Sequence, residues 1–187
     1  MLVISCHADT GFRAHSLHRM DDGTVYGHLD NFAGVWSVMK AYFSGRLNQG
    51  YVRIELTHGE ETDLAGARAV SATLEPSDVV LVIDVTGAPT EGDFTIEKCR
   101  SQKLRDFLQD TLAGMRFDLY EGCPDPIAST DESDIYRETC ELVFFLGVPC
   151  FGGDYNAGPV HCREQSLDAI AEAICRVAEA YPHLARR

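Results

Sequence analysis

Short apolar runs alternate with amphipathic stretches along the 187-residue chain. Residues 79–85 are nearly all aliphatic, which predicts a central strand that is covered on both faces. Residues 51–57 alternate apolar and polar side chains, which predicts a strand with one face more buried than the other. Further strands are predicted at 2–6, 94–99, 117–120 and 148–151, and helices after Asn31, after Glu61 and over 102–115, 135–146 and 167–178. This alternation is typical of a three-layer αβα sandwich with a mixed, mostly parallel sheet.

Capping residues and glycines refine this pattern in three places. The helix that Asn31 can cap has its large apolar residues on about one face, namely Val35, Trp36, Met39, Tyr42 and Phe43. Ser166 is expected to cap the last helix. A glycine-rich stretch over 152–159 predicts a loop, and this loop is expected to carry His161.

Composition and charge narrow the class of protein. Hydrophobic residues make up 45% of the chain and charged residues 24%, which is ordinary for a packed globular protein, so we expect residues 1–187 to form a single domain. Sixteen Lys and Arg against 29 Asp and Glu give a net charge of −13. This charge argues against nucleic-acid and membrane partners, which need clustered positive charge, and it permits a carboxylate-rich metal site.

The expected cellular setting is a reducing cytoplasm. No apolar run reaches the roughly 18 residues of a membrane-spanning helix. The first six residues have no basic segment before their apolar stretch, so they are interpreted as a strand rather than a signal peptide. The seven cysteines are odd in number and widely spaced, which predicts neither a disulfide framework nor a zinc ribbon.

Five separate segments place a His, Asp or Glu at the end of an apolar run or in the following turn. The residues concerned are His7 with Asp9, Asp30, Glu60 with Glu61, Asp84 and His161. Because ligands collect outside the carboxyl ends of strands in open α/β sheets, these side chains are expected to converge. Two His, two Asp and a Glu are a usual ligand set for zinc or a similar divalent ion.

Spacing within two of these segments suggests a division of roles. His7 and Asp9 are two residues apart, so in an extended backbone they face the same side, and Asp9 could accept a hydrogen bond from the ring nitrogen that is not on the metal. Glu60 and Glu61 are adjacent and cannot both face one metal in a regular strand. One could ligate while its neighbour acts as general base, which suits metal-assisted hydrolysis.

The ordered series resembles that of the co-catalytic zinc aminopeptidases and carboxypeptidase-like metallopeptidases of families M28, M42 and M20. Residues 30–35 and 60–67 are similar to the segments around the bridging Asp and the paired Glu of these families. Residues 83–86, Thr130 with Asp131, and the later segment 147–149 look closest to the M42 branch. The resemblance extends from residue 7 to about residue 168.

The resemblance implies specific roles for these residues. Asp30 would bridge two divalent ions, most simply zinc, with cobalt or manganese as alternatives. His7 and Asp84 would complete one metal site, and Glu61 and His161 the other. Glu60 would be the general base that activates a water molecule between the metals, and Asp9 would assist His7. The resemblance also implies a cis peptide between Asp30 and Asn31.

The sequence departs from the family pattern in three places. Only six residues precede His7, so the fold is expected to be N-terminally shortened, with a sheet that is reduced or completed by another subunit. Only 22 residues separate His7 from Asp30, which leaves no room for the inserted dimerisation domain of the M42 branch. Asp63 replaces a usual glycine. These differences affect the expected substrate and assembly more than metal binding.

Each residue also has a plain structural alternative. His7 could end a strand, and Asp84 could cap the turn after its strand. Asp30 could cap the helix that begins near Asn31, and the Glu60–Glu61 pair could begin a helix. The ordered set favours a dizinc amide hydrolase, most simply an aminopeptidase acting on short peptides. The alternatives are an N-acyl amino acid deacylase of the same family and a non-catalytic member that binds metal or ligand. A homo-oligomer is expected from the family and from the short N-terminal edge.

Overall fold

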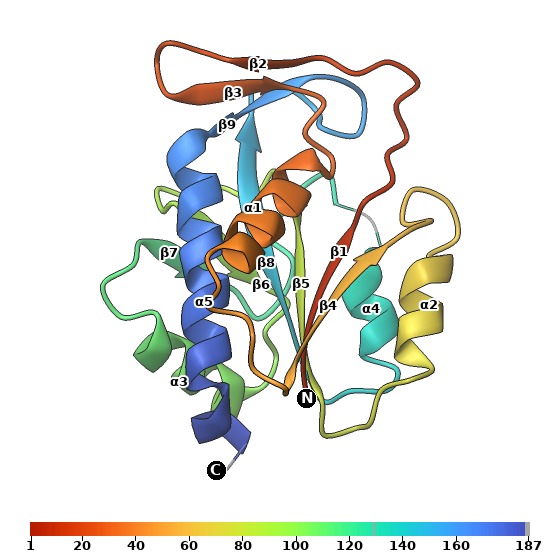
Figure 1. Ribbon diagram of the computed structural model, residues 1–187. Coiled ribbons are helices and arrows are strands. Elements are labelled where there is room, and N and C mark those ends of the chain that lie inside the picture. Colours follow the sequence, from red (N-terminus) through yellow and green to blue (C-terminus); the bar gives the residue numbers. More distant parts are fainter. Residues whose placement is uncertain (129, 186–187) are drawn as a thin grey trace.

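The computed structural model describes residues 1–128 and 130–185 and has a nine-stranded sheet with helices on both faces (Figure 1). The strands are β1 (Leu2–His7), β2 (Leu17–Arg19), β3 (Thr24–Gly27), β4 (Val52–Thr57), β5 (Val79–Thr86), β6 (Phe94–Glu97), β7 (Phe117–Leu119), β8 (Leu142–Phe151) and β9 (Val160–Arg163). The helices are α1 (Phe32–Phe43), α2 (Ala65–Ser71), α3 (Gln102–Thr111), α4 (Glu132–Tyr136) and α5 (Glu164–Ala185).

The sheet is mixed, with a parallel centre. Its strands run in the order β2-β3-β9-β8-β5-β1-β4, and β6 and β7 extend it from the side of β8. Strands β4, β1, β5 and β8 are mutually parallel, whereas β2, β3, β9 and β6 join through antiparallel pairs. Helices α1, α3 and α5 pack on one face, and α2 and α4 on the other. The predicted three-layer arrangement is therefore confirmed.

Strand β5 forms the centre of the core, as its aliphatic sequence predicts. Leu81 and Ile83 belong to the apolar cluster under α1 and α5, whereas Val80 and Val82 belong to the cluster under α2 and α4. All eight residues of β5 are buried. Burial of each Val, Leu or Ile side chain contributes about 1.5–3 kcal/mol relative to exposure, so this strand supplies a rigid base for the residues at its end.

The predicted helix over 135–146 is wrong. Helix α4 ends at Tyr136, and the apolar residues from Leu142 onward open the ten-residue strand β8, whose last part is the predicted strand 148–151. The reason is that Phe144 and Leu146 pack on one face of the sheet, and Val143 and Phe145 on the other. A short run that is apolar on both sides has no periodicity to separate a buried strand from a helix.

Helix α1 begins at its predicted cap but buries a different face from the one expected. Its inward residues are small, chiefly Ala33, Gly34, Ser37 and Ala41, whereas Trp36 is 46% exposed and Phe43 77% exposed. Small residues let the helix lie close to β1, β5 and α5. A Cβ at Gly34 would lie 2.2 Å from the side-chain oxygen of Asn31, so only glycine fits there.

The far end of the sheet contains strands that the sequence pattern did not predict. Strands β2, β3 and β9 form an antiparallel extension, and His161 lies in β9 rather than in the preceding loop. Ser166 lies inside α5, which already begins at Glu164, and so does not cap it. None of the helices in the described ranges is both long enough and apolar enough to cross a bilayer.

Candidate metal centre

Three of the predicted ligands converge where the central strands end. His7 is the last residue of β1, Asp84 lies near the end of β5, and Asp30 directly precedes the cap of α1. Each offers a ligand atom, and these atoms all lie within 4.8 Å of one another. The three residues are 1%, 8% and 7% exposed, respectively. No other trio of His, Cys, Asp or Glu among the described residues is arranged in this way.

Asn31 fixes the position of Asp30 relative to both strands. Its side-chain oxygen accepts a hydrogen bond from the Gly34 N–H at 2.9 Å and so caps α1. Its side-chain NH₂ donates to the Ile83 carbonyl at 2.9 Å and contacts the Cys6 sulfur at 3.4 Å. One buried side chain therefore ties the start of α1 to β5 and β1, each time at the residue just before a predicted ligand. The Asp30–Asn31 peptide is cis, as expected.

The geometry of the three ligand atoms fits a small divalent cation. His7 Nε2 lies 3.2 Å from Asp30 Oδ1 and 3.3 Å from Asp84 Oδ2. Nitrogen and oxygen ligands about 2.0–2.2 Å from a tetrahedral zinc ion are themselves about 3.3–3.5 Å apart. His7 Nε2 and Asp30 Oδ1 are buried without a partner in hydrogen-bond geometry. Buried polar atoms without partners are costly, and a shared cation would satisfy them.

Electrostatics favour the same occupant. Burial lowers the pKa of His7, but the adjacent carboxylates of Asp84 and Asp30 outweigh burial and raise this pKa to about 12. Burial raises the pKa of Asp84 to about 7, and the charge of His7 opposes that rise. The cluster therefore retains protons around neutral pH when it holds no cation. A divalent cation would replace those protons and neutralise the carboxylates.

Glu60 and Glu61 lie beside this cluster but are less enclosed. Both are half-buried in the turn between β4 and α2. Burial raises the pKa of Glu60 to about 8, and the charges of Asp84 and Asp30 raise it further while that of His7 lowers it, so Glu60 lies within range of these charges. Burial also raises the pKa of Glu61, and the Gly11 backbone opposes that rise. The two residues line a cavity of about 410 Å³ together with Arg68, Thr130 and Asn156.

The other two predicted residues lie outside the trio. Asp9 is on the Nδ1 side of His7, as the spacing predicts, but its Oδ1 is 3.6 Å from Nδ1, which is too long for a hydrogen bond. His161 packs against aromatic rings, with ring centroids 4.6 Å from Tyr26 and 5.6 Å from Phe151. The structure thus brings three of the five predicted metal ligands together.

Two buried carboxylates near the cluster were not predicted as supports from the sequence. Glu132 is buried beside β1 and accepts hydrogen bonds from Ser5, two residues before His7, and from Thr57 at the end of β4. Asp125 accepts from the Gly87 N–H at 2.7 Å and from the Tyr155 hydroxyl at 2.6 Å. Asp125 therefore ties the turn after β5 to the loop over 152–159. Neither residue comes after an apolar run, so no local pattern marks them.

No family model matches this sequence, and no curated protein matches it. Solved structures do match its fold. An aminopeptidase from the archaeon Desulfurococcus kamchatkensis is 16% identical with a TM-score of 0.74, and the alignment covers 92% of this chain and 54% of that one. The dodecameric PhTET1-12s is 15% identical with a TM-score of 0.71, covering 87% and 53%. An M18-family aminopeptidase from Thermotoga maritima is 13% identical with a TM-score of 0.66, covering 87% and 48%.

These matches establish the architecture and no more. The α/β fold with its mixed sheet is shared with these three proteins, two of which are aminopeptidases, and this chain spans about half the length of each. Identity of 13–16% is too low to carry activity across by itself.

Proposed function

We propose that this chain is a divalent-metal-dependent hydrolase of amide bonds, acting as an aminopeptidase on short peptides. The observation that carries this proposal is the buried trio of His7, Asp30 and Asp84, whose ligand atoms lie within 4.8 Å of one another at the carboxyl ends of β1 and β5. The aminopeptidase fold of the structural neighbours supports it. In open α/β sheets, ligands bind in the crevice outside the carboxyl ends of the strands, which is where this trio lies.

The residues divide into metal ligands and a proton carrier. His7, Asp30 and Asp84 would hold the first ion. Asp30 and Glu61 would provide ligands for a second ion. Zinc, cobalt and manganese are the candidates for both metal sites. Bound ions would supply Lewis-acid activation of the scissile carbonyl. The fifth ligand of the predicted series, His161, would have to leave its contacts with Tyr26 and Phe151 to join them.

Glu60 is the residue proposed to move the proton. It lies within range of the charges of Asp84, Asp30 and His7, beside the cavity after β4. A carboxylate in this position can take a proton from the attacking water and return it to the departing amine, and bound cations would keep it ionised and able to accept that proton. The cavity beside Glu60, which extends to Thr130 and Asn156, would hold the peptide. The half-buried position of Glu60 excludes part of the bulk water that would otherwise compete for this proton.

Substitution of the proposed base separates catalysis from metal binding. We expect the zinc-, cobalt- or manganese-loaded protein to release chromophore from aminoacyl anilides and to cleave dipeptides. Glu60→Gln should lower kcat by about 10²–10⁴-fold while metal content is unchanged, because the amide keeps the shape and cannot accept a proton. Glu138→Gln is the matched control, since Glu138 is exposed just before β8, at the opposite end of the sheet.

Two results would overturn the hydrolase proposal. One is full activity in Glu60→Gln. The other is a metal-loaded wild-type protein that cleaves no substrate in a broad panel of anilides, dipeptides and N-acyl amino acids. Cleavage of N-acyl amino acids alone would support amide hydrolysis but replace the aminopeptidase by a deacylase.

A further inference from the structure

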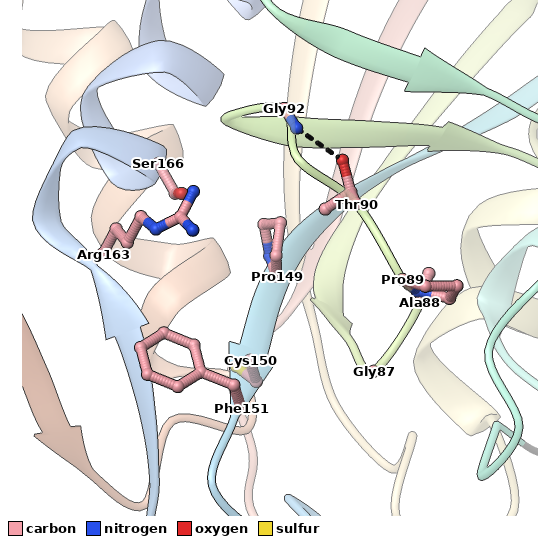
Figure 2. Close-up of a pocket in the computed structure, with 10 residues that line it drawn as sticks. All are labelled: Gly87, Ala88, Pro89, Thr90, Gly92, Pro149, Cys150, Phe151, Arg163 and Ser166. Carbon is pink, nitrogen blue, oxygen red and sulfur yellow. Dashed lines mark hydrogen bonds between the residues drawn. The ribbon is translucent and has the colours of Figure 1, made fainter.

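A second hollow lies beside the candidate metal centre and contains a single cationic side chain (Figure 2). Its floor is the end of β8 from Pro149 to Phe151, one wall is the turn over 87–92, and the other wall carries Arg163 and Ser166. The volume is about 260 Å³. Pockets for whole drug-sized ligands measure about 300–1,000 Å³, so this one suits one side chain or one end group.

Strand register places this hollow next to the metal centre. Thr86 pairs with Pro149 of the floor, and Asp84 lies two residues before Thr86 on the same strand. Alternate residues of a strand face the same side and are about 7 Å apart, so the floor of the hollow at Pro149 lies on the same face as Asp84, two residues farther along the strand direction. A substrate bound at the metals would therefore place a neighbouring group of its chain at the hollow.

The guanidinium of Arg163 has no anionic partner. Figure 2 shows it at the mouth of the hollow, on the same wall as Ser166. Within the described part of the chain, Arg163 forms no ion pair, and its guanidinium makes no hydrogen bond. The acidic residues nearest to it in α5 are engaged elsewhere, Glu164 with Arg19 and Asp168 with Lys40. In a chain of net charge −13, an unpaired cation facing a cavity is poised to bind an anion.

We propose that this hollow is a substrate subsite that binds a carboxylate group through Arg163, with the buried Ser166 offering a hydroxyl donor on the same wall. Guanidinium groups bind carboxylates through paired, charge-assisted hydrogen bonds, and the other lining groups are backbone or uncharged. The inference rests on the proposed function, since it needs a substrate held at the adjacent metal centre. It assigns that substrate to the acidic class.

The carboxylate could come from two positions in a peptide. It could be the side chain of a glutamyl or aspartyl residue at the cleaved bond, or the terminal carboxylate of a dipeptide. Two matched ligand pairs distinguish these sources. Glutamic acid α-amide and glutaminamide differ only in the side-chain carboxylate, whereas leucylglycine and leucylglycinamide differ only in the terminal one.

Binding of these four ligands is measured by calorimetry on the Glu60→Gln protein with zinc present, so that no ligand is consumed. We expect the carboxylate member of one pair to bind about tenfold or more tightly than its amide, because charge-assisted hydrogen bonds are strong. Arg163→Met should remove this preference, and Arg163→Lys should restore part of it. Because Arg163 is exposed, Arg163→Met is expected to fold, and its melting temperature checks this.

The matched control is Arg100→Met. It removes one positive charge from an exposed residue after β6, at the opposite end of the sheet, and should leave the preference intact. Equal affinity within both pairs, or a preference that survives Arg163→Met, would overturn the inference. Turnover by the wild-type protein tests the hydrolase proposal separately. If the preference depends on Arg163 but no substrate is hydrolysed, the subsite is supported and the hydrolase proposal is rejected. If substrates are hydrolysed but no such preference exists, the hydrolase proposal is supported and the subsite is rejected.

Discussion

The two halves of the candidate metal centre differ in how firmly the fold holds them. His7 and Asp84 end two neighbouring buried strands, and Asp30 is fixed through the hydrogen bond from Asn31 to Ile83. Glu60 and Glu61 instead lie half-exposed in a turn after β4, which is the edge strand with β1 as its one partner. Sites on paired strands are held more accurately than sites in turns. We therefore expect one tightly held ion and one that depends on ordering of the turn.

The largest expected effect is a loss of metal affinity when a ligand on a strand is replaced. The same replacement in the turn after β4 is the comparison. Asp84→Asn should weaken binding of the first zinc ion by at least about 100-fold, more than loss of a supporting group costs a metal site. Glu61→Gln makes the same change of charge and should leave the first ion bound while it weakens the second. Metal content after dialysis, measured by mass spectrometry, separates the two outcomes. Equal losses from both variants would show that the halves do not differ.

A smaller effect should result from releasing the tie between α1 and the sheet. Asn31→Ala removes both the cap and the buried hydrogen bond to Ile83, so the free energy of unfolding should fall by about 2–3 kcal/mol. Ser101→Ala is the control, because Ser101 only caps the exposed start of α3, and it should cost about 1 kcal/mol. Urea unfolding of the two metal-free variants provides the measurement. If Asn31→Ala cost no more than Ser101→Ala, Asn31 would be a cap alone and Asp30 would lack this support.

The sequence predicted the parts of the fold that strong local patterns encode. The aliphatic run of β5, the alternation in β4 and the cap at Asn31 all identify elements that the structure contains. It failed where tertiary packing overrides pattern. Leu142–Leu146 is apolar on both faces and so has no period, and the exposed Trp36 and Phe43 suggested a buried face that α1 does not have. The three-residue strand β2 is too short and too exposed to give a signal.

The residues of the candidate site were likewise predictable only where a local pattern marks them. His7, Asp30 and Asp84 each lie at or after the end of an apolar run, so the pattern located them at the ends of strands. Their order along the chain, which is similar to that in the metallopeptidase families, grouped them into one site. Asp125, Glu132 and Arg163 have no such marker, because their roles depend on partners far away in the sequence. The contacts of His161 depend on the pairing of β9 with β3 and β8, which the pattern did not predict.

The central claim is that His7, Asp30 and Asp84 hold a divalent cation, and a zinc titration tests it most directly. Chelator-treated wild-type and His7→Ala proteins are titrated with zinc by calorimetry under identical conditions. The wild-type protein should bind one ion tightly and a second at least about tenfold more weakly, and the tight phase should be missing from His7→Ala. A wild-type protein that binds no zinc, or a tight phase that persists in His7→Ala, would contradict the account.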